Sequence, residues 1–325
     1  MPDYLDLIEK KNEEMSELHR RMDDDAGLKN LKAYVMKDTE GNKISNIVHV
    51  TLDRPRLIAE HIISAMGDDK QQVVVESEDK DVDTKYIEDF QRAMFAMADA
   101  RLRRQGLWQL NPYADEQLCI RGRGVRRILV REERNQKSGK MALIPDIVPW
   151  DARYVTHVMG EEGLDWAGYQ HKMTKAEIEG EAWAIKKGFI LEKKDAVVTD
   201  VWDMEANYVY VDKDVEHEEK HLWDFCPVVM QVVSLGSMLA DEGALQYEGE
   251  SIFFLVRKAL AELHRLASIM QTQNLKSIKP PVQEKSKEGR DAGKYEDRMG
   301  MSSITPAEIG GGIEVIAFGD VLRAM

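Results

Sequence analysis

The sequence has little cysteine and no recognisable secretion signal. Only two of its 325 residues are cysteines, Cys119 and Cys226, and they form no CxxC motif. Two cysteines are too few for a disulfide framework, so we expect a reducing compartment. The first residues are charged and amphipathic and lack the apolar core that a secretory signal peptide needs. A signal peptide is therefore not expected.

The sequence also lacks an excess of basic residues. It contains 59 acidic and 45 basic residues, which gives a formal net charge of -14. Proteins that grip nucleic acid use lysine and arginine to displace counterions from phosphates, so tight, static DNA binding is not expected. The hydrophobic content of 43% is sufficient for a core. A chain of this length can form one large domain or two ordinary ones.

Helical patterns dominate the first part of the chain. A charged helix is predicted over residues 4–22, as a peripheral arm. Pro55 near the start and Gly67 at the end bound a second helix. Thr84 is the expected cap of a third helix, which ends at Gly106.

Strand patterns dominate the middle of the chain. Residues 118–120 and 125–130 predict a hairpin across the basic turn 121–124, with exposed arginines; the spacing of a phosphate-binding P-loop is absent. Thr174 and Glu177 predict a capping box for a short helix. Further strands are predicted over 142–148, 197–201, 208–211 and 228–233. Helices, then a mostly β region, then a long helix indicate the α+β class.

The longest predicted helix covers residues 251–274, with Ser251 as its N-cap. Such a helix is roughly 36 Å long. Apolar residues at helical spacing predict one buried face; they are Ile252, Leu255, Val256, Ala259, Leu260, Leu263, Leu266, Ala267 and Met270.

The opposite stripe of this helix is polar and is expected to face a channel, a subunit interface or solvent. Glu262 and Arg265 are three residues apart and can form an ion pair. The charges in the helix exclude a membrane span, which needs about 20 nearly uninterrupted apolar residues. The stripe comprises Lys258, Glu262, Arg265 and Thr272.

A charged segment with two adjacent prolines follows the long helix. Prolines cannot continue a helix, and the segment has little apolar surface to bury, so a solvated, mobile tip is expected over residues 276–290. An ordinary core helix followed by a surface loop is the alternative interpretation. The residues that could dock a partner here are Pro280, Pro281, Lys285, Lys287 and Arg290.

One short motif suggests a metal. His217, Glu218 and His221 match H-E-x-x-H, in which two histidines one helical turn apart bind zinc and the glutamate acts as a base. The two middle positions of a buried zinc helix are rarely charged, yet here they are Glu219 and Lys220. A solvated turn between two strands is therefore the favoured interpretation, and a zinc-dependent hydrolase is kept as an alternative.

Four stretches in order resemble the bacteriophage portal proteins, which are ring-shaped head-to-tail connectors. They are the helix that begins DRPRLIAE at Asp53, the segment VPWDAR at Val148, the strand CPVVM at Cys226, and GESIFFLVRKAL at Gly249 followed by Pro280 and Pro281. The resemblance implies an N-terminal helical arm (1–33), a wing domain (34–245), a stem helix (246–275), a clip (276–312) and the start of a returning stem segment (313–325). A chain that ends at this point is expected to be incomplete.

The resemblance also implies a function and its partners. Portal proteins form homo-oligomeric rings, usually of twelve subunits, at one vertex of the virion capsid. Double-stranded DNA passes through the ring without sequence-specific binding, and the partners are the large terminase subunit, head-tail adaptor or tail proteins, and capsid or scaffold protein. Portal proteins are not enzymes, need no cofactor and do not span a membrane. A non-portal structural adaptor with a long exposed helix is a second alternative.

Overall fold

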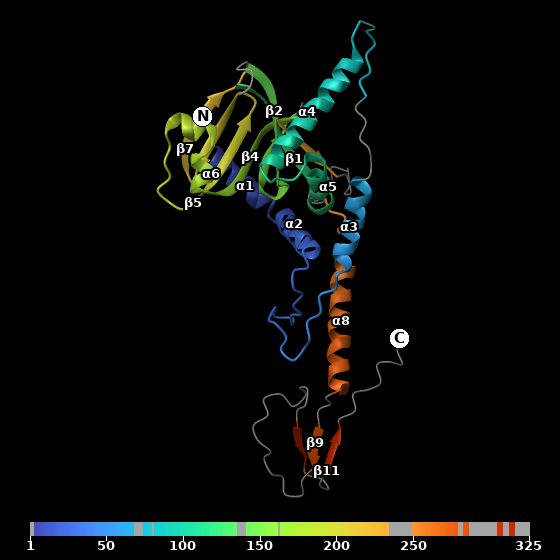
Figure 1. Cartoon of the computed structure of the whole chain (residues 1–325). Helices are drawn as coiled ribbons and strands as arrows, with labels where there is room; N and C mark the ends of the chain where they lie inside the picture. Colours follow the sequence, from blue (N-terminus) through green and yellow to red (C-terminus); the bar gives the residue numbers. More distant parts are fainter. Residues whose placement is uncertain are drawn as a thin grey trace. The chain divides into compact units, whose positions relative to one another are not determined.

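The computed structural model describes residues 3–67, 74–79, 81–134, 141–161, 163–233, 249–278, 282–285, 304–307 and 312–315. The chain separates into two compact units. Figure 1 labels their helices and strands. The larger unit comprises Met1–Lys29 and Leu57–Phe254, and the smaller unit comprises Asn30–Arg56 and Leu255–Met325. Helices and strands occur together without βαβ alternation, which confirms the α+β class.

Two antiparallel sheets form the centre of the larger unit. The first is a five-stranded meander of β3 (Val155–Met159), β4 (Leu164–Thr174), β5 (Asp195–Asp203), β6 (Ala206–Val211) and β7 (Asp214–Lys220), each paired with the next. The second has the order β2 (Met141–Trp150), β1 (Arg123–Arg134) and β8 (Val228–Val232). The strands predicted around 142–148, 197–201, 208–211 and 228–233 are thus confirmed.

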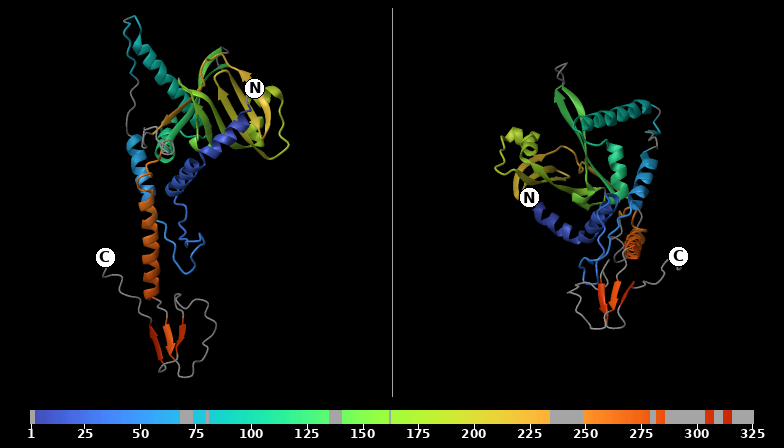
Figure 2. Two further views of the ribbon diagram at one scale, coloured as in Figure 1. Left: turned by 180° about the vertical axis from the view of Figure 1, so that it is seen from behind. Right: turned by 60° about the horizontal axis from the view of Figure 1, so that its bottom comes forward.

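The helices of the larger unit lie against these sheets, and the longest of them extends away from the sheets at one end (Figure 2). The predicted capping box of Thr174 and Glu177 is present. The helix predicted to start at Thr84 begins there, although its N-cap is Asp83, whose carboxylate accepts from Tyr86 N–H. The helices are α1 (Tyr4–Glu14), α2 (Ser16–Lys29), α4 (Thr84–Arg104), α5 (Leu110–Arg121), the 3-10 turn η1 (Ala152–Tyr154), α6 (Lys175–Glu179) and α7 (Ala182–Lys187). Helix α3 (Arg54–Gly67), with the predicted bounds, begins in the smaller unit and continues in the larger.

The N-terminal helix is part of the core, which corrects the prediction of a peripheral arm. Tyr4 and Ile8 are four residues apart, lie on one face of α1, and are buried against the five-stranded sheet. The Tyr4 hydroxyl donates to the Asp203 carboxylate at 2.6 Å. Gly168 in β4 leaves room for Ile8, because a Cβ atom there would lie 2.8 Å from the Ile8 Cδ1 atom. The prediction failed because residues 4–22 form two helices, and the charges of the first lie away from this face.

No hairpin crosses residues 121–124, which corrects a second prediction. Residues 118–120 belong to helix α5, and Gly122 ends that helix with a left-handed φ of 69°. A Cβ atom on Gly122 would overlap the backbone of Gly249, so only glycine fits this position. Three consecutive apolar residues fit a strand or a buried helix equally well, and here the helical alternative holds.

The smaller unit is built around helix α8 (Arg257–Ile278). Strands β9 (Val282–Lys285), β10 (Ile304–Ala307) and β11 (Gly312–Val315) form a sheet in which β9 is central, parallel to β10 and antiparallel to β11. Part of the segment expected to be a solvated tip is therefore a strand. Residues 313–315, expected to begin a second stem helix, are also a strand.

Helix α8 begins six residues later than predicted, because Ser251 has another role. The Ser251 side chain is buried, and its hydroxyl donates to the Asp25 carboxylate at 2.6 Å. The same oxygen accepts from Phe253 N–H at 3.1 Å. Residues 252–256 form turns rather than helix. Ser251 thus anchors the end of the larger unit instead of capping α8.

The observed units divide the chain differently from the boundaries that the resemblance implied. Residues 30–56 belong with α8 in the smaller unit, whereas residues 34–56 were assigned to the wing. The first 29 residues belong with the sheets of the larger unit. Among the described residues, the helices are too short or too polar to cross a membrane.

Candidate interaction surface of the long helix

Helix α8 buries one row of side chains, mostly polar, which we call the polar stripe from here on; it shares only Thr272 with the stripe predicted from the sequence. The buried residues recur at every fourth position and are Leu260, His264, Ser268 and Thr272. Thr272 was predicted to lie on an exposed polar stripe, and this prediction is wrong. The side chain that should have been solvated is only 6% exposed.

An extended segment of the smaller unit covers this stripe and forms a ladder of hydrogen bonds with it. Val48 N–H donates to the Thr272 hydroxyl and Val50 N–H donates to the Ser268 hydroxyl, both at 2.9 Å. The His264 Nε2 atom lies 3.4 Å from the Leu52 carbonyl oxygen. The segment runs antiparallel to α8, since its residue numbers rise as those of the helix fall.

The spacing of this ladder follows from elementary geometry. Two extended residues advance about 6.6 Å, and four helical residues advance about 6 Å, so every second amide meets every fourth side chain. Each hydroxyl also donates within the helix, from Ser268 to the His264 carbonyl at 2.8 Å and from Thr272 to the Ser268 carbonyl at 2.7 Å. The polar stripe is thus satisfied internally by residues of its own unit.

His264 ends the ladder as a buried neutral side chain. Its ring lies 5.3 Å from the ring of Tyr34, measured between centroids. Burial lowers the pKa of His264, because a charged imidazole loses hydration there. Sequence periodicity missed His264 and Ser268, although their spacing of four with Thr272 was the available signal.

Most of the apolar residues that were predicted to be buried are exposed, although Leu260 is buried as predicted. The predicted burial is therefore wrong for most of this face. Leu263 and Leu266 are each 46% exposed, and Met270 is 40% exposed. Together with Ala259, and with Val256 in the turn just before the helix, they recur at alternating intervals of three and four residues. That is the a and d spacing of helices that pack along one another. We call these five residues the apolar stripe.

The ion pair predicted between Glu262 and Arg265 is present. The Arg265 Nε atom lies 3.2 Å from a Glu262 carboxylate oxygen, and both side chains are more than half exposed. Lys258 is also exposed. An exposed pair of this kind contributes about 0.2–0.5 kcal/mol to helix stability.

The predicted docking segment is described only in part. Lys285 is the last residue of β9, where it is in register with Ala307 and Gly312. The other four predicted docking residues, Pro280, Pro281, Lys287 and Arg290, lie outside the described residues.

The H-E-x-x-H sequence lies mainly in strand β7, which corrects the prediction of a turn. His217 is in the strand and its ring stacks on Trp183, with centroids 6.1 Å apart. His221 follows the strand, and its Nε2 atom lies 3.2 Å from the Asp203 carbonyl oxygen. The one-turn helical spacing that would direct both imidazoles to one metal is not formed. Over the described ranges, no group of three or more His, Cys, Asp or Glu residues could hold a metal ion.

The basic cluster at 121–127 is internal, although its arginines were expected to be exposed. Arg123 is 5% exposed. Arg127 bridges two strands, through ion pairs with Asp146 at 3.2 Å and Asp200 at 3.0 Å. The Arg127 guanidinium compensates these carboxylates and Arg123 is buried, so neither is available as a phosphate cradle.

The sequence matches neither any model of a known protein family nor any curated protein.

Proposed function

We propose that this chain is the subunit of a portal-like head-to-tail connector, a homo-oligomeric ring at a capsid vertex through which double-stranded DNA passes. The apolar stripe of α8 is the observation that carries the proposal. A stem helix in a ring must pack against neighbouring subunits along its length. In this helix the polar stripe is already covered by residues 48–52, and the apolar stripe remains exposed.

Burial of the apolar stripe between subunits would stabilise an assembly. Each exposed leucine, valine or methionine gains about 1.5–3 kcal/mol when it is fully buried, so half-burial of several such side chains provides several kcal/mol per interface. Monomeric proteins rarely leave such a contiguous apolar surface open. A closed ring repeats this interface at every subunit and leaves no copy with an uncovered stripe.

The charges on the same helix suit a conduit for DNA. Lys258, Glu262 and Arg265 are of mixed sign, and the whole chain carries a net charge of -14. Such a surface does not accumulate the lysine and arginine contacts that hold phosphates in place. The proposal places the subunit in the virion, with the large terminase subunit, head-tail adaptor or tail proteins and capsid or scaffold protein as partners, with no catalytic activity and no cofactor.

Native mass spectrometry and negative-stain imaging test the proposal. We expect a closed ring for the unmodified chain, and loss of the ring when Leu263→Glu and Leu266→Glu are combined. Leu222→Glu is the matched control, because Leu222 is a fully exposed leucine outside α8. Only monomers or dimers of the unmodified chain at micromolar concentration would refute the ring.

Two outcomes would favour the alternatives. A dimer that depends on Leu263 and Leu266 would indicate a structural adaptor with a paired helix. Stoichiometric zinc that disappears when His217 and His221 are both replaced by alanine would indicate a metal-dependent hydrolase.

A further inference from the structure

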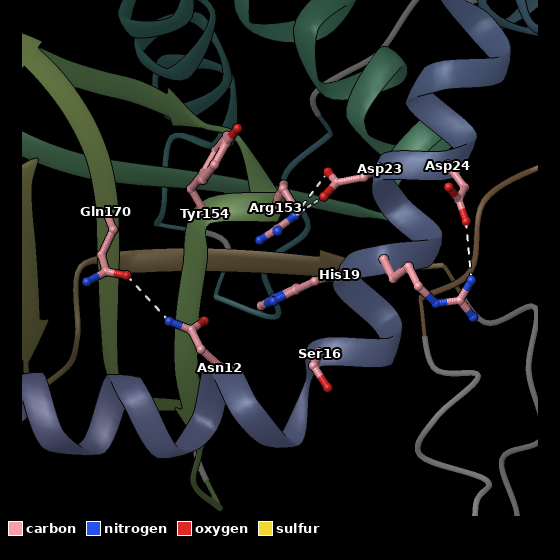
Figure 3. A pocket seen from close by; sticks show the side chains of 9 residues that line it. Asn12, Ser16, His19, Asp23, Asp24, Arg153, Tyr154 and Gln170 are labelled. Atoms are coloured by element: carbon pink, nitrogen blue, oxygen red, sulfur yellow. Dashed lines mark hydrogen bonds and ion pairs between the residues drawn. The ribbon is translucent and has the colours of Figure 1, made fainter. Parts of the chain in front are cut away.

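A polar pocket lies in the larger unit, between helices α1 and α2, the 3-10 turn η1 and strand β4 (Figure 3). Its volume is about 520 Å³. Small-molecule sites commonly occupy about 300–1,000 Å³. The residues that define it include Asn12, His19, Asp23, Arg153, Tyr154 and Gln170.

His19 is the most informative residue of the pocket. Its side chain is only 5% exposed, and its Nε2 atom is buried without a hydrogen-bond partner among the described residues. In Figure 3 the ring extends from α2 between Arg153 and Asn12. A buried polar atom without a partner costs free energy, and a ligand group in the pocket that pairs with this nitrogen would remove that cost.

Arg153 presents a cation to the same space. Its Nε atom donates to both carboxylate oxygens of Asp23 at 3.0 Å. Its terminal nitrogens point away from Asp23 in Figure 3. Its guanidinium also lies 5.5 Å from the centre of the Tyr154 ring, which fixes its orientation from a second side. A guanidinium held in this way is prepared to bind an oxyanion through two parallel hydrogen bonds.

The electrostatic surroundings of His19 are net positive. Arg153, Arg123 and Arg121 act on the imidazole from η1, β1 and α5, and Asp23 in α2 opposes them. Burial is the largest cause, and together with these arginines it lowers the pKa of His19 to about 4. The side chain is therefore neutral at pH 7, and its unpartnered nitrogen can accept or donate according to its tautomer.

We propose that this pocket binds a small molecule through an oxyanion group that Arg153 and His19 hold together. The pocket is larger than a phosphate ion, so the ligand extends beyond its charged group. The amide side chains of Asn12 and Gln170 line the remaining wall, where Asn12 Nδ2 donates to Gln170 Oε1 at 3.4 Å (Figure 3). Asn12 Oδ1 accepts from the Thr156 hydroxyl and Gln170 Nε2 donates to the Thr199 hydroxyl, so the second N–H of each amide is the donor left for a ligand hydroxyl. A polyol phosphate has this chemistry. The inference does not depend on ring formation.

Calorimetric titration of the full chain with inorganic phosphate and with glycerol 3-phosphate tests the proposal. We expect saturable one-to-one binding, tighter for glycerol 3-phosphate. Arg153→Gln should weaken binding by about tenfold or more, because charge-assisted hydrogen bonds are the strong ones. Arg92→Gln is the control, since Arg92 makes only exposed ion pairs with Glu88 and Asp89 and does not line the pocket.

His19→Phe is the second variant, in case the loss of the Arg153 ion pair prevents folding. It keeps an aromatic ring and removes the unpartnered nitrogen, and it should also weaken binding. NMR titration of the His19 ring provides an independent measurement, because a bound anion favours the protonated imidazole and should raise its pKa. The proposal would be overturned if neither probe binds saturably. It would also be overturned if His19→Phe and the unmodified chain bind the probes with equal affinity. Binding that a short oligonucleotide displaces would assign the pocket to nucleic-acid phosphate instead and would also overturn it.

Discussion

The hydrogen-bond ladder between residues 48–52 and helix α8 predicts a specific loss of stability. Ser268→Ala removes the acceptor for Val50 N–H, and Thr272→Val removes the acceptor for Val48 N–H while keeping the branched shape. A partly buried amide that loses its acceptor costs about 1–3 kcal/mol. We expect each change to lower the free energy of unfolding of the smaller unit by about 1–2 kcal/mol.

Hydrogen exchange measures this effect at the two amides themselves. If the ladder restrains the segment, exchange at Val50 should accelerate in Ser268→Ala by about tenfold, which corresponds to about 1.4 kcal/mol. Val48 should respond in the same way to Thr272→Val. The loss should be local, because the changes leave the apolar stripe untouched.

Ser277→Ala is the matched control on the same helix. Its exposed hydroxyl donates to the Gln273 carbonyl at 3.0 Å. Surface substitutions of this kind usually change stability by less than about 0.5 kcal/mol. Unchanged exchange at Val48 and Val50 in the two ladder variants would refute the reasoning, because the side-chain acceptors would then carry no part of the restraint.

Three further predictions concern charge and pH. Glu262→Ala should leave assembly intact in native mass spectrometry, since it breaks only an exposed pair worth about 0.2–0.5 kcal/mol; loss of the ring would show that this position is an interface. Folding lowers the pKa of His19 from 6.5 to about 4, so between these pH values the folded state binds fewer protons than the unfolded state. The free energy of unfolding should therefore be highest above pH 6.5 and should fall by up to about 3 kcal/mol as the pH approaches 4. Denaturant titrations across this range should show a smaller fall in His19→Phe, and an identical fall would contradict the assignment. Replacement of the clip cations Lys285, Lys287 and Arg290 by glutamate should leave the ring assembled but weaken terminase binding, more at low salt than at high salt. An unchanged rate of DNA packaging would exclude these residues as a docking site.

The sequence could predict the existence of most elements but not which face of the long helix is covered. Helical spacing and a capping box are local signals, and they correctly placed α3, α4 and α6. The face of α8 depends on residues 48–52, more than 200 positions earlier in the chain. No local pattern reveals such a partner, so the usual assumption that apolar residues are buried was wrong for most of the apolar residues of α8, with Leu260 as the exception.

The errors near Gly122 and Ser251 have the same origin. Residues 118–120 read as a strand because three apolar residues in a row fit either structure. Ser251 was predicted to be an N-cap because its hydroxyl is suited to that role, but in the structure this hydroxyl donates to the Asp25 carboxylate. The pocket around His19 was not predictable either, since it combines α1, α2, η1 and β4, which are distant in the sequence.

The matched rises of an extended segment and a helix restrict which insertions and deletions this region can tolerate. Deletion of one residue between Val48 and Leu52 turns the following amide away from the helix, because successive N–H groups of an extended chain point in opposite directions. Deletion of two residues keeps the orientation and costs one rung. An insertion or deletion in this unit preserves the pattern of hydrogen bonds only if the extended segment changes by two residues for every four residues that the helix gains or loses.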